Sequence, residues 1–136
     1  MPQFRIGQAA SLLGVSDDTV RRWVDDGRLT VDRDDAGRMV LDGAELADYA
    51  RELAERHHLP EVGGVSSSAR NRFTGLVTRV LRDGVMAQVD LQCGPFRVVS
   101  LMSAEAVDEL GLEPGSLASA VVKATTVVVE APKDHP

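Results

Sequence analysis

Apolar residues recur every three or four positions in three segments of the first 58 residues, which predicts three α-helices. The segments run from about 7 to 13, from 17 to about 27 and from 43 to about 58. Gly14 is suited to end the first helix because glycine readily adopts a left-handed backbone conformation, and Ser16 is suited to cap the second. Two short helices joined by a turn that contains glycine predict a helix-turn-helix.

Short β-type runs at 29–33 and 38–41 flank a polar loop, which predicts a β-hairpin after the second helix. Asp42 then precedes the third helix, and Glu45 follows it at the spacing of a capping box. A helix-turn-helix followed by a two-stranded wing and a further helix predicts a winged helix-turn-helix domain over residues 1–58.

The pattern changes near position 60, where helical spacing gives way to short runs of β-branched residues. Residues 59–67 contain a proline, a glycine pair and serines, which predicts a linker between two domains. From Val85 to Cys93 every second residue is apolar, and these residues alternate with Met86, Gln88, Asp90 and Gln92, as in a half-buried strand. Cys93 falls on the apolar side, so a buried structural thiol is favoured over a nucleophile or a metal ligand.

Turn signals divide the second half into five strands, with a short helix at 104–110 between the third and fourth strands. This order predicts a small OB-type barrel, because closure removes exposed sheet edges. The expected fold class is therefore α+β, with the barrel domain over 68–131 and a disordered tail over 132–136. The five strands are expected at 73–82, 85–93, 96–102, 117–123 and 127–130.

Composition and charge narrow the function classes. The 136 residues include one cysteine and no apolar run long enough to cross a membrane, which favours the cytoplasm and no membrane partner. The net charge of −6 argues against a protein that coats nucleic acid non-specifically, and residues 1–58 hold 8 basic and 12 acidic side chains. The sequence has no Ser/His/Asp or Cys/His arrangement, metal-ligand spacing or glycine-rich phosphate loop, so an enzyme is not expected.

The stretch FRIGQAASLLGVSDDTVRRWVDDGRLTVDRDDAGRMVLDGAELADYARELA, residues 4–54, resembles the MerR-type and excisionase-type DNA-binding domains. The resemblance implies that double-stranded DNA is a partner. The second helix would enter the major groove, and the wing would reach the backbone or the minor groove. The alternative is that arginines of the second helix pair on the surface with acidic residues at 17, 18, 25 or 26. The candidate DNA-binding residues are Thr19, Arg21, Arg22, Arg33 and Arg38.

Residues 66–131 closely resemble the Mop domain of molbindins, which is also grouped with the TOBE domains. The resemblance implies that the chain binds molybdate or tungstate and has no catalytic cofactor. The motifs that carry it are SARN at 68–71, Gly75, ELGL-x-x-G at 109–115 and VKAT at 122–125.

A tetrahedral dianion offers only acceptors, so its site requires converging hydroxyls, backbone N–H groups and cations. One segment with such donors precedes the first strand of the barrel, and another lies at the break between the fourth and fifth strands. The family also implies main-chain contacts at 86–87. For Arg70 and Lys123 the alternative is an ordinary solvated charge. The candidate oxyanion-binding residues are Ser68, Ala69, Arg70, Met86, Ala87, Lys123, Ala124 and Thr125.

Two functions are consistent with these two domains. The first is a DNA-binding transcriptional regulator that responds to molybdate or tungstate. The second is a cytoplasmic storage or buffering protein, a molbindin whose N-terminal head has no regulatory role. One Mop unit per chain implies that a homo-oligomer completes the site, either as a dimer or as a hexamer built as a trimer of dimers.

Overall fold

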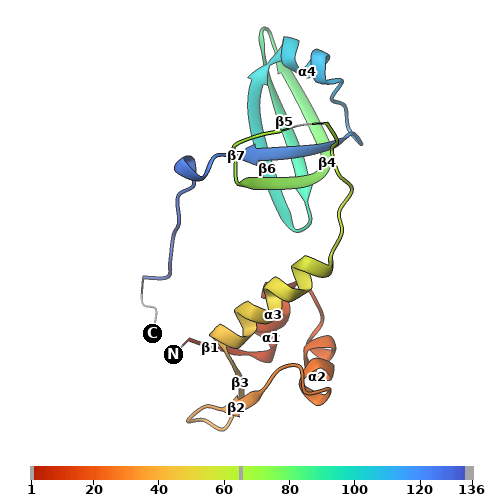
Figure 1. The fold of residues 1–136 in the computed structure, drawn as a ribbon. Helices are drawn as coiled ribbons and strands as arrows, with labels where there is room; N and C mark the ends of the chain where they lie inside the picture. Colours follow the sequence, from red (N-terminus) through yellow and green to blue (C-terminus); the bar gives the residue numbers. More distant parts are fainter. Residues whose placement is uncertain (1, 65, 134–136) are drawn as a thin grey trace. The chain divides into compact units, whose positions relative to one another are not determined.

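The computed structural model describes residues 2–64 and 66–133 and separates the chain into two compact units. The first unit comprises residues 1–58 and 130–136, and the second comprises residues 59–129 (Figure 1). Helices and antiparallel sheets are both present, so the fold is α+β as predicted. Residues 134–136 of the predicted disordered tail lie outside the described part of the chain.

The described residues of the first unit form three helices and a three-stranded antiparallel sheet in the order β1-β3-β2. The pattern predicted the β2–β3 hairpin but not β1. This strand pairs with β3 through Phe4 opposite Leu41, a partner far along the chain. The elements are β1 (Gln3–Arg5), α1 (Ile6–Leu13), α2 (Asp17–Asp25), β2 (Val31–Arg33), β3 (Met39–Asp42) and α3 (Gly43–Arg56).

Local caps end α1 and begin α2, as the sequence predicted. Gly14 follows α1 with a φ of 69°, in the left-handed region where a side chain would be strained. Ser16 Oγ accepts a hydrogen bond from the Thr19 N–H at 3.2 Å, so one of the otherwise unpaired N–H groups of α2 has a partner.

The capping box predicted for α3 is only half formed. Asp42 caps the helix by accepting a hydrogen bond from the Glu45 N–H at 3.1 Å. The Glu45 carboxylate, however, accepts hydrogen bonds from Thr30, at 2.7 Å from its N–H and 3.1 Å from its hydroxyl. Glu45 therefore ties the segment before β2 to the first turn of α3.

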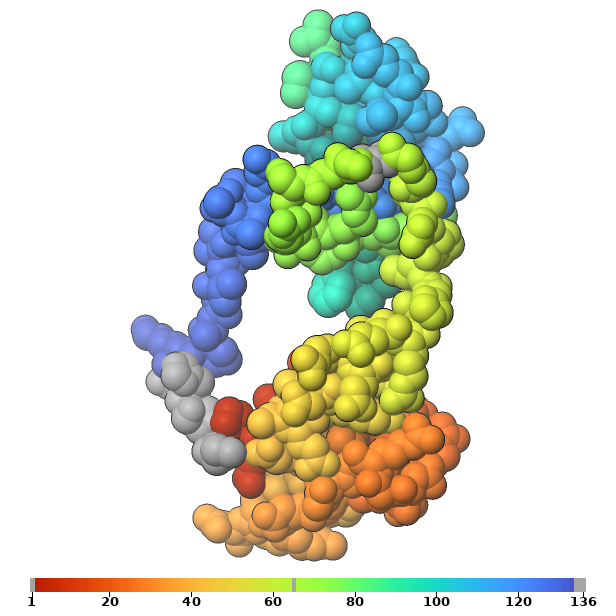
Figure 2. Space-filling model, in the orientation of Figure 1, coloured from red at the N-terminus to blue at the C-terminus, as the bar shows by residue number. Residues whose placement is uncertain are grey.

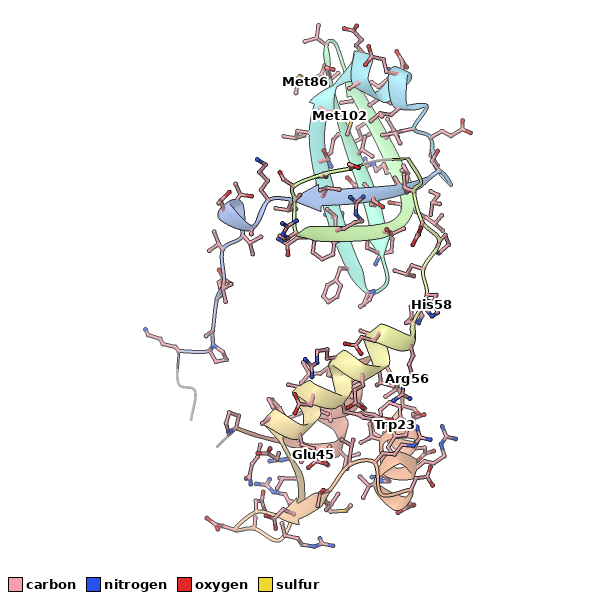
Figure 3. The ribbon with its side chains drawn as sticks, in the orientation of Figure 1. Trp23, Glu45, Arg56, His58, Met86 and Met102 are labelled. Carbon is pink, nitrogen blue, oxygen red and sulfur yellow. The ribbon has the colours of Figure 1, made fainter. Side chains whose placement is uncertain are left out.

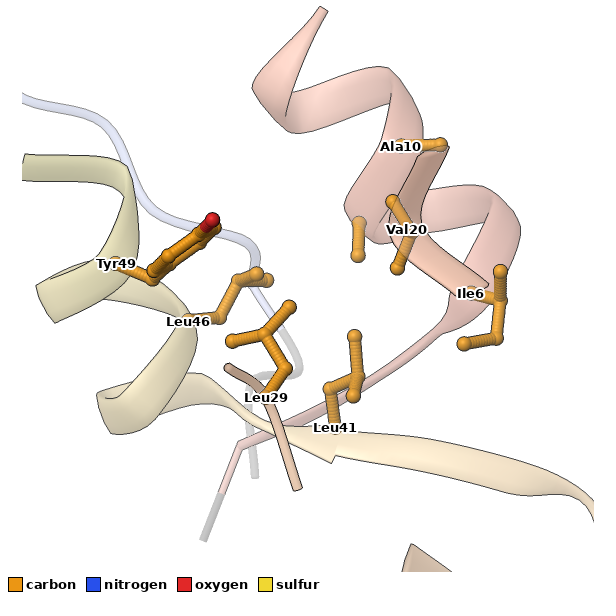
Figure 4. Close-up of a cluster of buried hydrophobic side chains, with 8 residues drawn as sticks. Ile6, Ala10, Val20, Leu29, Leu41, Leu46 and Tyr49 are labelled. Carbon is orange, nitrogen blue, oxygen red and sulfur yellow. The ribbon is translucent and has the colours of Figure 1, made fainter. Parts of the chain in front are cut away.

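The core of the first unit lies where the helices meet the sheet (Figure 4). The small side chains of Ala9 and Ala10 are almost fully buried on α1, and Val20 of α2 is fully buried. Trp23 packs against this cluster, and its ring meets the ring of Tyr49 edge-on with centroids 5.0 Å apart. The buried cluster comprises Ile6, Ala9, Ala10, Val20, Leu29, Leu41, Leu46 and Tyr49.

The described residues of the second unit form a four-stranded antiparallel sheet in the order β6-β5-β4-β7, with one α-helix. The first part of the 13-residue strand β4 pairs with β7, and the remainder pairs with β5. The register of β4 shifts between Val77 and Arg79, and such a bulge bends a strand, so the sheet curls. The short helix falls between β6 and β7, where it was predicted. The elements are β4 (Asn71–Asp83), β5 (Met86–Cys93), β6 (Phe96–Ser103), α4 (Ala104–Leu110), β7 (Leu117–Val122) and the 3-10 helix η1 (Ala124–Thr126).

The prediction of a fifth strand at 127–130 is wrong, because these residues pair with no strand in the described part of the chain. After β7 the chain turns through η1 and continues as an extended segment (Figure 2). Val128 and Val129 are each 85% exposed, although valine favours a paired, half-buried strand. The sheet is therefore curled but not closed within one chain, with β6 and β7 at its edges.

The apolar face of the curled sheet is only partly covered. Cys93 is buried there, as its place in the alternation predicted, and Val107 of α4 is fully buried against the same face. An open groove of about 410 Å³ remains, and it receives side chains from both edge strands. Among the residues that line it are Leu91, Val98, Met102, Leu112, Leu117 and Ala120.

Candidate functional site

Two of the predicted oxyanion-binding segments meet at one end of the β4–β7 pair. Asn71, the first residue of β4, lies opposite Val122, the last residue of β7. The Asn71 side-chain Nδ2 donates a hydrogen bond to the Val122 carbonyl oxygen at 3.1 Å. The structure therefore brings together the segment 68–70, which precedes β4, and the segment 123–125, which follows β7.

The chain turns sharply directly after β7. Lys123 is extended, and the next three residues form η1. The Lys123 carbonyl oxygen accepts hydrogen bonds from the Thr126 N–H at 3.0 Å and from the Thr126 hydroxyl at 2.9 Å. The first N–H groups of a helical turn have no acceptor within that turn. Those of Ala124 and Thr125 are consequently available as donors, and both residues are exposed.

Positive charge is present on both segments. Arg70 and Lys123 are exposed, and no carboxylate lies within 4.0 Å of either cation among the described residues. Lys123 is also the first lysine in the sequence. Ser68 and Thr125 add hydroxyl groups at the same end of the strand pair. Cations, hydroxyls and unpaired N–H groups at one place are the donor set that a tetrahedral oxyanion requires.

Met86 and Ala87 do not belong to this cluster within one chain. Met86 pairs with Asp83, at the opposite end of β4 from Asn71. The 13 residues of β4 span about 40 Å when straight. Figure 3 shows Met86 and Met102 at the end of the sheet beside α4. Met86 is 47% exposed, whereas Ala87 is 3% exposed and pairs with Arg82 of β4 and with Met102 of β6.

Asn71 and Ser67 belong to the site's surroundings but were not among the residues predicted from the sequence. Asn71 joins the two halves of the cluster through its amide, and its signal was its place as the last residue of the SARN motif. Ser67 Oγ accepts a hydrogen bond from the Ala69 N–H at 3.1 Å and so shapes the turn that leads into β4. Both residues position the cluster through hydrogen bonds rather than through charge.

The DNA-binding candidates on α2 have different surroundings. The Thr19 hydroxyl lies 3.0 Å from Ser16 Oγ and takes part in the helix cap. Arg21 forms an exposed ion pair with Asp18 at 3.7 Å, as in the alternative of surface pairing on the second helix. Arg22 is exposed, and no carboxylate lies within 4.0 Å of its guanidinium among the described residues.

The candidates on the β2–β3 hairpin are held by local bonds. Arg33 Nη1 donates to the Gly37 carbonyl oxygen at 2.8 Å. Arg38 Nε donates to Asp34 Oδ2 at 3.1 Å. The pKa of Asp34 is lowered mainly by the hydrogen bond from the Arg38 backbone N–H and further by the Arg38 guanidinium. These bonds make the loop a compact turn that presents two guanidinium groups.

Other kinds of site find no support in the part of the chain that the structure describes. No group of three or more His, Cys, Asp or Glu side chains is placed to hold a metal ion. Among the described helices, none is both long enough and apolar enough to cross a membrane.

Comparison with protein families assigns each half of the chain to a domain type. A helix-turn-helix domain model matches residues 4–54, and the TOBE domain model matches residues 67–129. The chain is 38% identical over 66 residues to molybdenum-pterin-binding protein 2 of Clostridium pasteurianum, a match that covers 48% of this chain and 97% of that protein. It is 39% identical over 75 residues to the molybdenum transport protein ModE of Herbaspirillum seropedicae, covering 54% of this chain and 28% of that protein. Among solved structures, a molybdate-binding protein from Sporomusa ovata matches with 28% identity and a TM-score of 0.48, covering 49% of this chain and 100% of that one.

Proposed function

Because this chain belongs to the TOBE-domain family and also carries a helix-turn-helix domain, we propose that it is a cytoplasmic transcriptional regulator that binds DNA and responds to molybdate. The single observation that carries the proposal is the presence of both domains on one chain of 136 residues. Binding of the oxyanion would be the signal, and DNA binding by the helix-turn-helix domain would be the activity that it regulates. Tungstate has nearly the same size and charge and would bind at the same site.

The proposed oxyanion site is the end of the β4–β7 pair. Lys123 and Arg70 supply positive charge, Ser68 and Thr125 supply hydroxyls, and the turn at η1 supplies N–H groups. Charge-assisted hydrogen bonds of this kind are about twice as strong as neutral ones. The Asn71–Val122 hydrogen bond supports the proposal because it holds the two donor segments in register before an ion arrives.

We propose that a second copy of the chain completes this site. Met86 and Ala87 lie at the far end of β4, so they could join the donors at Asn71 only from another subunit. The exposed valines at 127–129 support the same assembly. Among the described residues these valines pair with no strand, and no described segment covers the apolar groove of about 410 Å³. A dimer, or a hexamer built as a trimer of dimers, would bury both.

The proposed DNA-binding surface is α2 together with the β2–β3 hairpin, which would act as the wing. Arg22 is the strongest base-contact candidate, because its guanidinium is exposed and lacks a carboxylate partner among the described residues. Arginine reads guanine through two parallel hydrogen bonds in the major groove. Arg33 and Arg38 at the hairpin turn would contact the phosphate backbone or the minor groove.

Molybdate would regulate DNA binding by favouring one oligomeric arrangement over another. A ligand shifts an equilibrium only by the difference in its affinity for the two states. An ion that binds between subunits has a higher affinity for one arrangement, because the complete site exists only in that arrangement. The spacing of the helix-turn-helix heads would then differ between the free and the oxyanion-bound oligomer.

The test is a fluorescence anisotropy titration of the full chain on labelled DNA from its own promoter, with and without molybdate. Isothermal titration calorimetry with molybdate, tungstate and sulfate runs alongside. We expect molybdate to bind and to change the DNA affinity by about 5- to 150-fold. Unchanged DNA affinity in the presence of saturating molybdate would contradict the regulatory role.

The acidic head favours a second candidate function, storage or buffering of the oxyanion. Residues 1–58 carry 8 basic and 12 acidic side chains, and Arg21 and Arg38 are paired with carboxylates. Net negative charge opposes the phosphate contacts that supply most DNA affinity. Oxyanion binding by the oligomer, combined with no DNA affinity even at low salt, would select this function over regulation.

A further inference from the structure

The carboxylate of Glu45 bonds to the residue that precedes β2 rather than to its own helix. Glu45 lies in the first turn of α3 (Figure 3), and its Oε1 accepts hydrogen bonds from the Thr30 N–H at 2.7 Å and from the Thr30 hydroxyl at 3.1 Å. No arginine, lysine or histidine lies within 4.0 Å of this carboxylate among the described residues. A negative charge opposes the approach of DNA phosphates, so an acid at this place requires an explanation.

Thr30 stands where the chain passes from the end of α2 into the β2–β3 hairpin. The pairing of the two strands begins at Val31, which lies opposite Leu41. The residue before Thr30, Leu29, is 3% exposed and belongs to the core cluster. Apolar contacts have no preferred direction, whereas hydrogen bonds do. Leu29 therefore anchors this segment in the core, and the two bonds to Glu45 restrict the direction in which β2 leaves it.

The turn of the hairpin is held by bonds of its own. The Asp34 N–H donates to the Arg38 carbonyl oxygen at 3.0 Å, and Asp34 Oδ1 accepts from the Arg38 N–H at 2.9 Å. Arg33 reaches across the same turn to the Gly37 carbonyl oxygen. A hairpin that is fixed within itself moves as one piece, so a change of orientation at Thr30 displaces Arg33 and Arg38 together.

We propose that Glu45 is a positioning residue for DNA binding, which holds Thr30 so that the β2–β3 hairpin presents Arg33 and Arg38 to the duplex that α2 enters. The inference rests on the proposed function, because it requires that the head binds DNA through both elements. Groups that are already held in the binding geometry lose less freedom on binding, which raises the affinity. The alternative is that Glu45 only stabilises α3, as an acid in the first turn of a helix does.

The experiment compares Glu45→Ala, Glu45→Gln and Thr30→Val in the full chain, with Glu52→Ala as the matched control. Glu52 is an acid of the same helix that pairs with Arg56 at 3.7 Å, so its removal changes the net charge by the same amount. Thr30→Val keeps the branched shape and the N–H and removes only the hydroxyl. Fluorescence anisotropy on labelled DNA from the chain's own promoter measures the affinity. Circular dichroism melts show whether each variant is folded.

We expect Glu45→Ala to weaken DNA binding by about fivefold, although the loss of a negative charge by itself would strengthen it. Glu45→Gln still offers an acceptor oxygen, and Thr30→Val still donates its N–H. Each of these two variants should therefore weaken binding by only about twofold. Glu52→Ala should bind as tightly as wild type or slightly more tightly. The opposite directions of Glu45→Ala and Glu52→Ala separate positioning from the effect of charge.

A double-mutant cycle shows whether Glu45 acts through the hairpin. Arg33→Ala and, on α2, Arg22→Ala are each measured in the wild-type and the Glu45→Ala backgrounds. We expect Arg33→Ala to weaken binding by about tenfold in wild type and by about twofold in Glu45→Ala, because the hairpin is then no longer held toward the DNA. Arg22→Ala should have the same effect in both backgrounds, since α2 ends before the Thr30 bonds. Thr30→Val takes the place of Glu45→Ala in the cycle if the alanine variant is unfolded.

Three results would overturn the inference. If folded Glu45→Ala binds DNA as tightly as Glu52→Ala does, the carboxylate serves only the stability of α3. If Arg33→Ala weakens binding equally in both backgrounds, Glu45 does not act through the hairpin. If Arg33→Ala has no effect in wild type, the hairpin turn does not contact DNA. A wild-type chain that binds no promoter DNA at low salt would instead refute the DNA-binding function, and this inference with it.

Discussion

Asn71 lies directly opposite Val122, and its side-chain amide donates a hydrogen bond to the Val122 carbonyl oxygen at 3.1 Å. This pair stands where β4 begins and β7 ends, so it aligns the donors at 68–70 with those at 123–125. At the end of a strand pair, where the backbone hydrogen bonds end, a side-chain hydrogen bond can continue the pairing. The spacing of the two donor segments therefore depends on the backbone pairing of β4 with β7 and on this one amide group.

Replacing Asn71 with alanine is expected to weaken molybdate binding by about fivefold, since one neutral hydrogen bond contributes about 1 kcal/mol. Calorimetric titration of the full chain measures the affinity. Thr74→Ala is the matched control, because its hydroxyl also bridges β4 and β7, at 2.7 Å from Ser119 Oγ, but away from the ladder end. Both variants should lower the melting temperature slightly, and only Asn71→Ala should lower the affinity. An equal loss in both would mean that general sheet stability, rather than alignment, controls the site.

Lys123→Ala is expected to reduce molybdate affinity by about tenfold to a hundredfold, because a hydrogen bond to a charged group contributes about 1.5–3 kcal/mol. Lys133→Ala provides a control, since Lys133 is the other lysine of the sequence and lies beyond the strands. Calorimetry at two salt concentrations also separates a direct contact from long-range attraction, which salt screens. If Lys123→Ala binds molybdate with wild-type affinity, the oxyanion site is not at this end of the β4–β7 pair.

The double substitution Val128→Asp and Val129→Asp is expected to dissociate the proposed oligomer. Both side chains are 85% exposed in the single chain, so the change costs little there. Burying two carboxylates against an apolar face of another subunit would cost several kcal/mol. Native mass spectrometry and light scattering report the subunit number. Val128→Thr, a β-branched and uncharged change, should leave the assembly intact. An unchanged oligomer in the aspartate variant would show that this segment is not at the interface.

Gly75→Ala is expected to destabilise the second unit by about 2 kcal/mol or more, because overpacking at a close contact forces the backbone to shift. A Cβ at Gly75 would lie 2.2 Å from the Gln92 carbonyl oxygen and 2.9 Å from the Cys93 Cα. The melting temperature should fall by about 8 °C or more. Gly63→Ala is the control, since an added Cβ there meets no atom within 4 Å. Equal melting temperatures for the two variants would contradict the close approach of β4 and β5 at this point.

Acid is expected to destabilise the sheet through Asp90. This residue is 4% exposed, and its carboxylate accepts hydrogen bonds from Gln88 Nε2 at 3.0 Å and from Arg97 Nη2 at 2.7 Å. These bonds, Gln88 first and then Arg97, lower the pKa of Asp90 below its ordinary value of 3.8. A lowered pKa in the folded state stabilises the fold above the unfolded value, and that contribution is lost as pH falls through the folded pKa.

The wild-type melting temperature should therefore decline as the pH drops below about 4. Asp90→Asn should melt lower than wild type at pH 7 and lose less on acidification. Circular dichroism melts from neutral to acidic pH measure both effects. Asp83→Asn, an exposed change at the end of β4, is the control and should follow the wild-type profile. If the melting temperatures of Asp90→Asn and wild type fall in parallel as the pH is lowered, another group causes the loss of stability in acid.

Much of the first unit could be predicted from the sequence because its signals are local. Ser16 and Asp42 cap helices with their own side chains, and Gly14 ends one through its backbone freedom. The helix-turn-helix domain and the TOBE domain were likewise identified from motifs at family spacing, and the comparisons confirm both. In contrast, β1 was not predicted. A strand of three residues is too short to show an alternating pattern, and β1 is stabilised by its pairing with β3.

The alternation predicted for β5 places Asp90 on its exposed face, but this residue is only 4% exposed. The sequence by itself determined the helix caps, the position of β5 and the residue types of the candidate site. Each of these follows from neighbours along the chain. Only the tertiary structure decided that Asn71 joins Val122, that Met86 lies at the other end of β4, and that 127–130 pairs with no strand among the described residues. The physical reason is that a strand is stable only when another strand satisfies its hydrogen bonds. A run of valines favours a β-strand, but the fold determines whether another strand is close enough to pair with it.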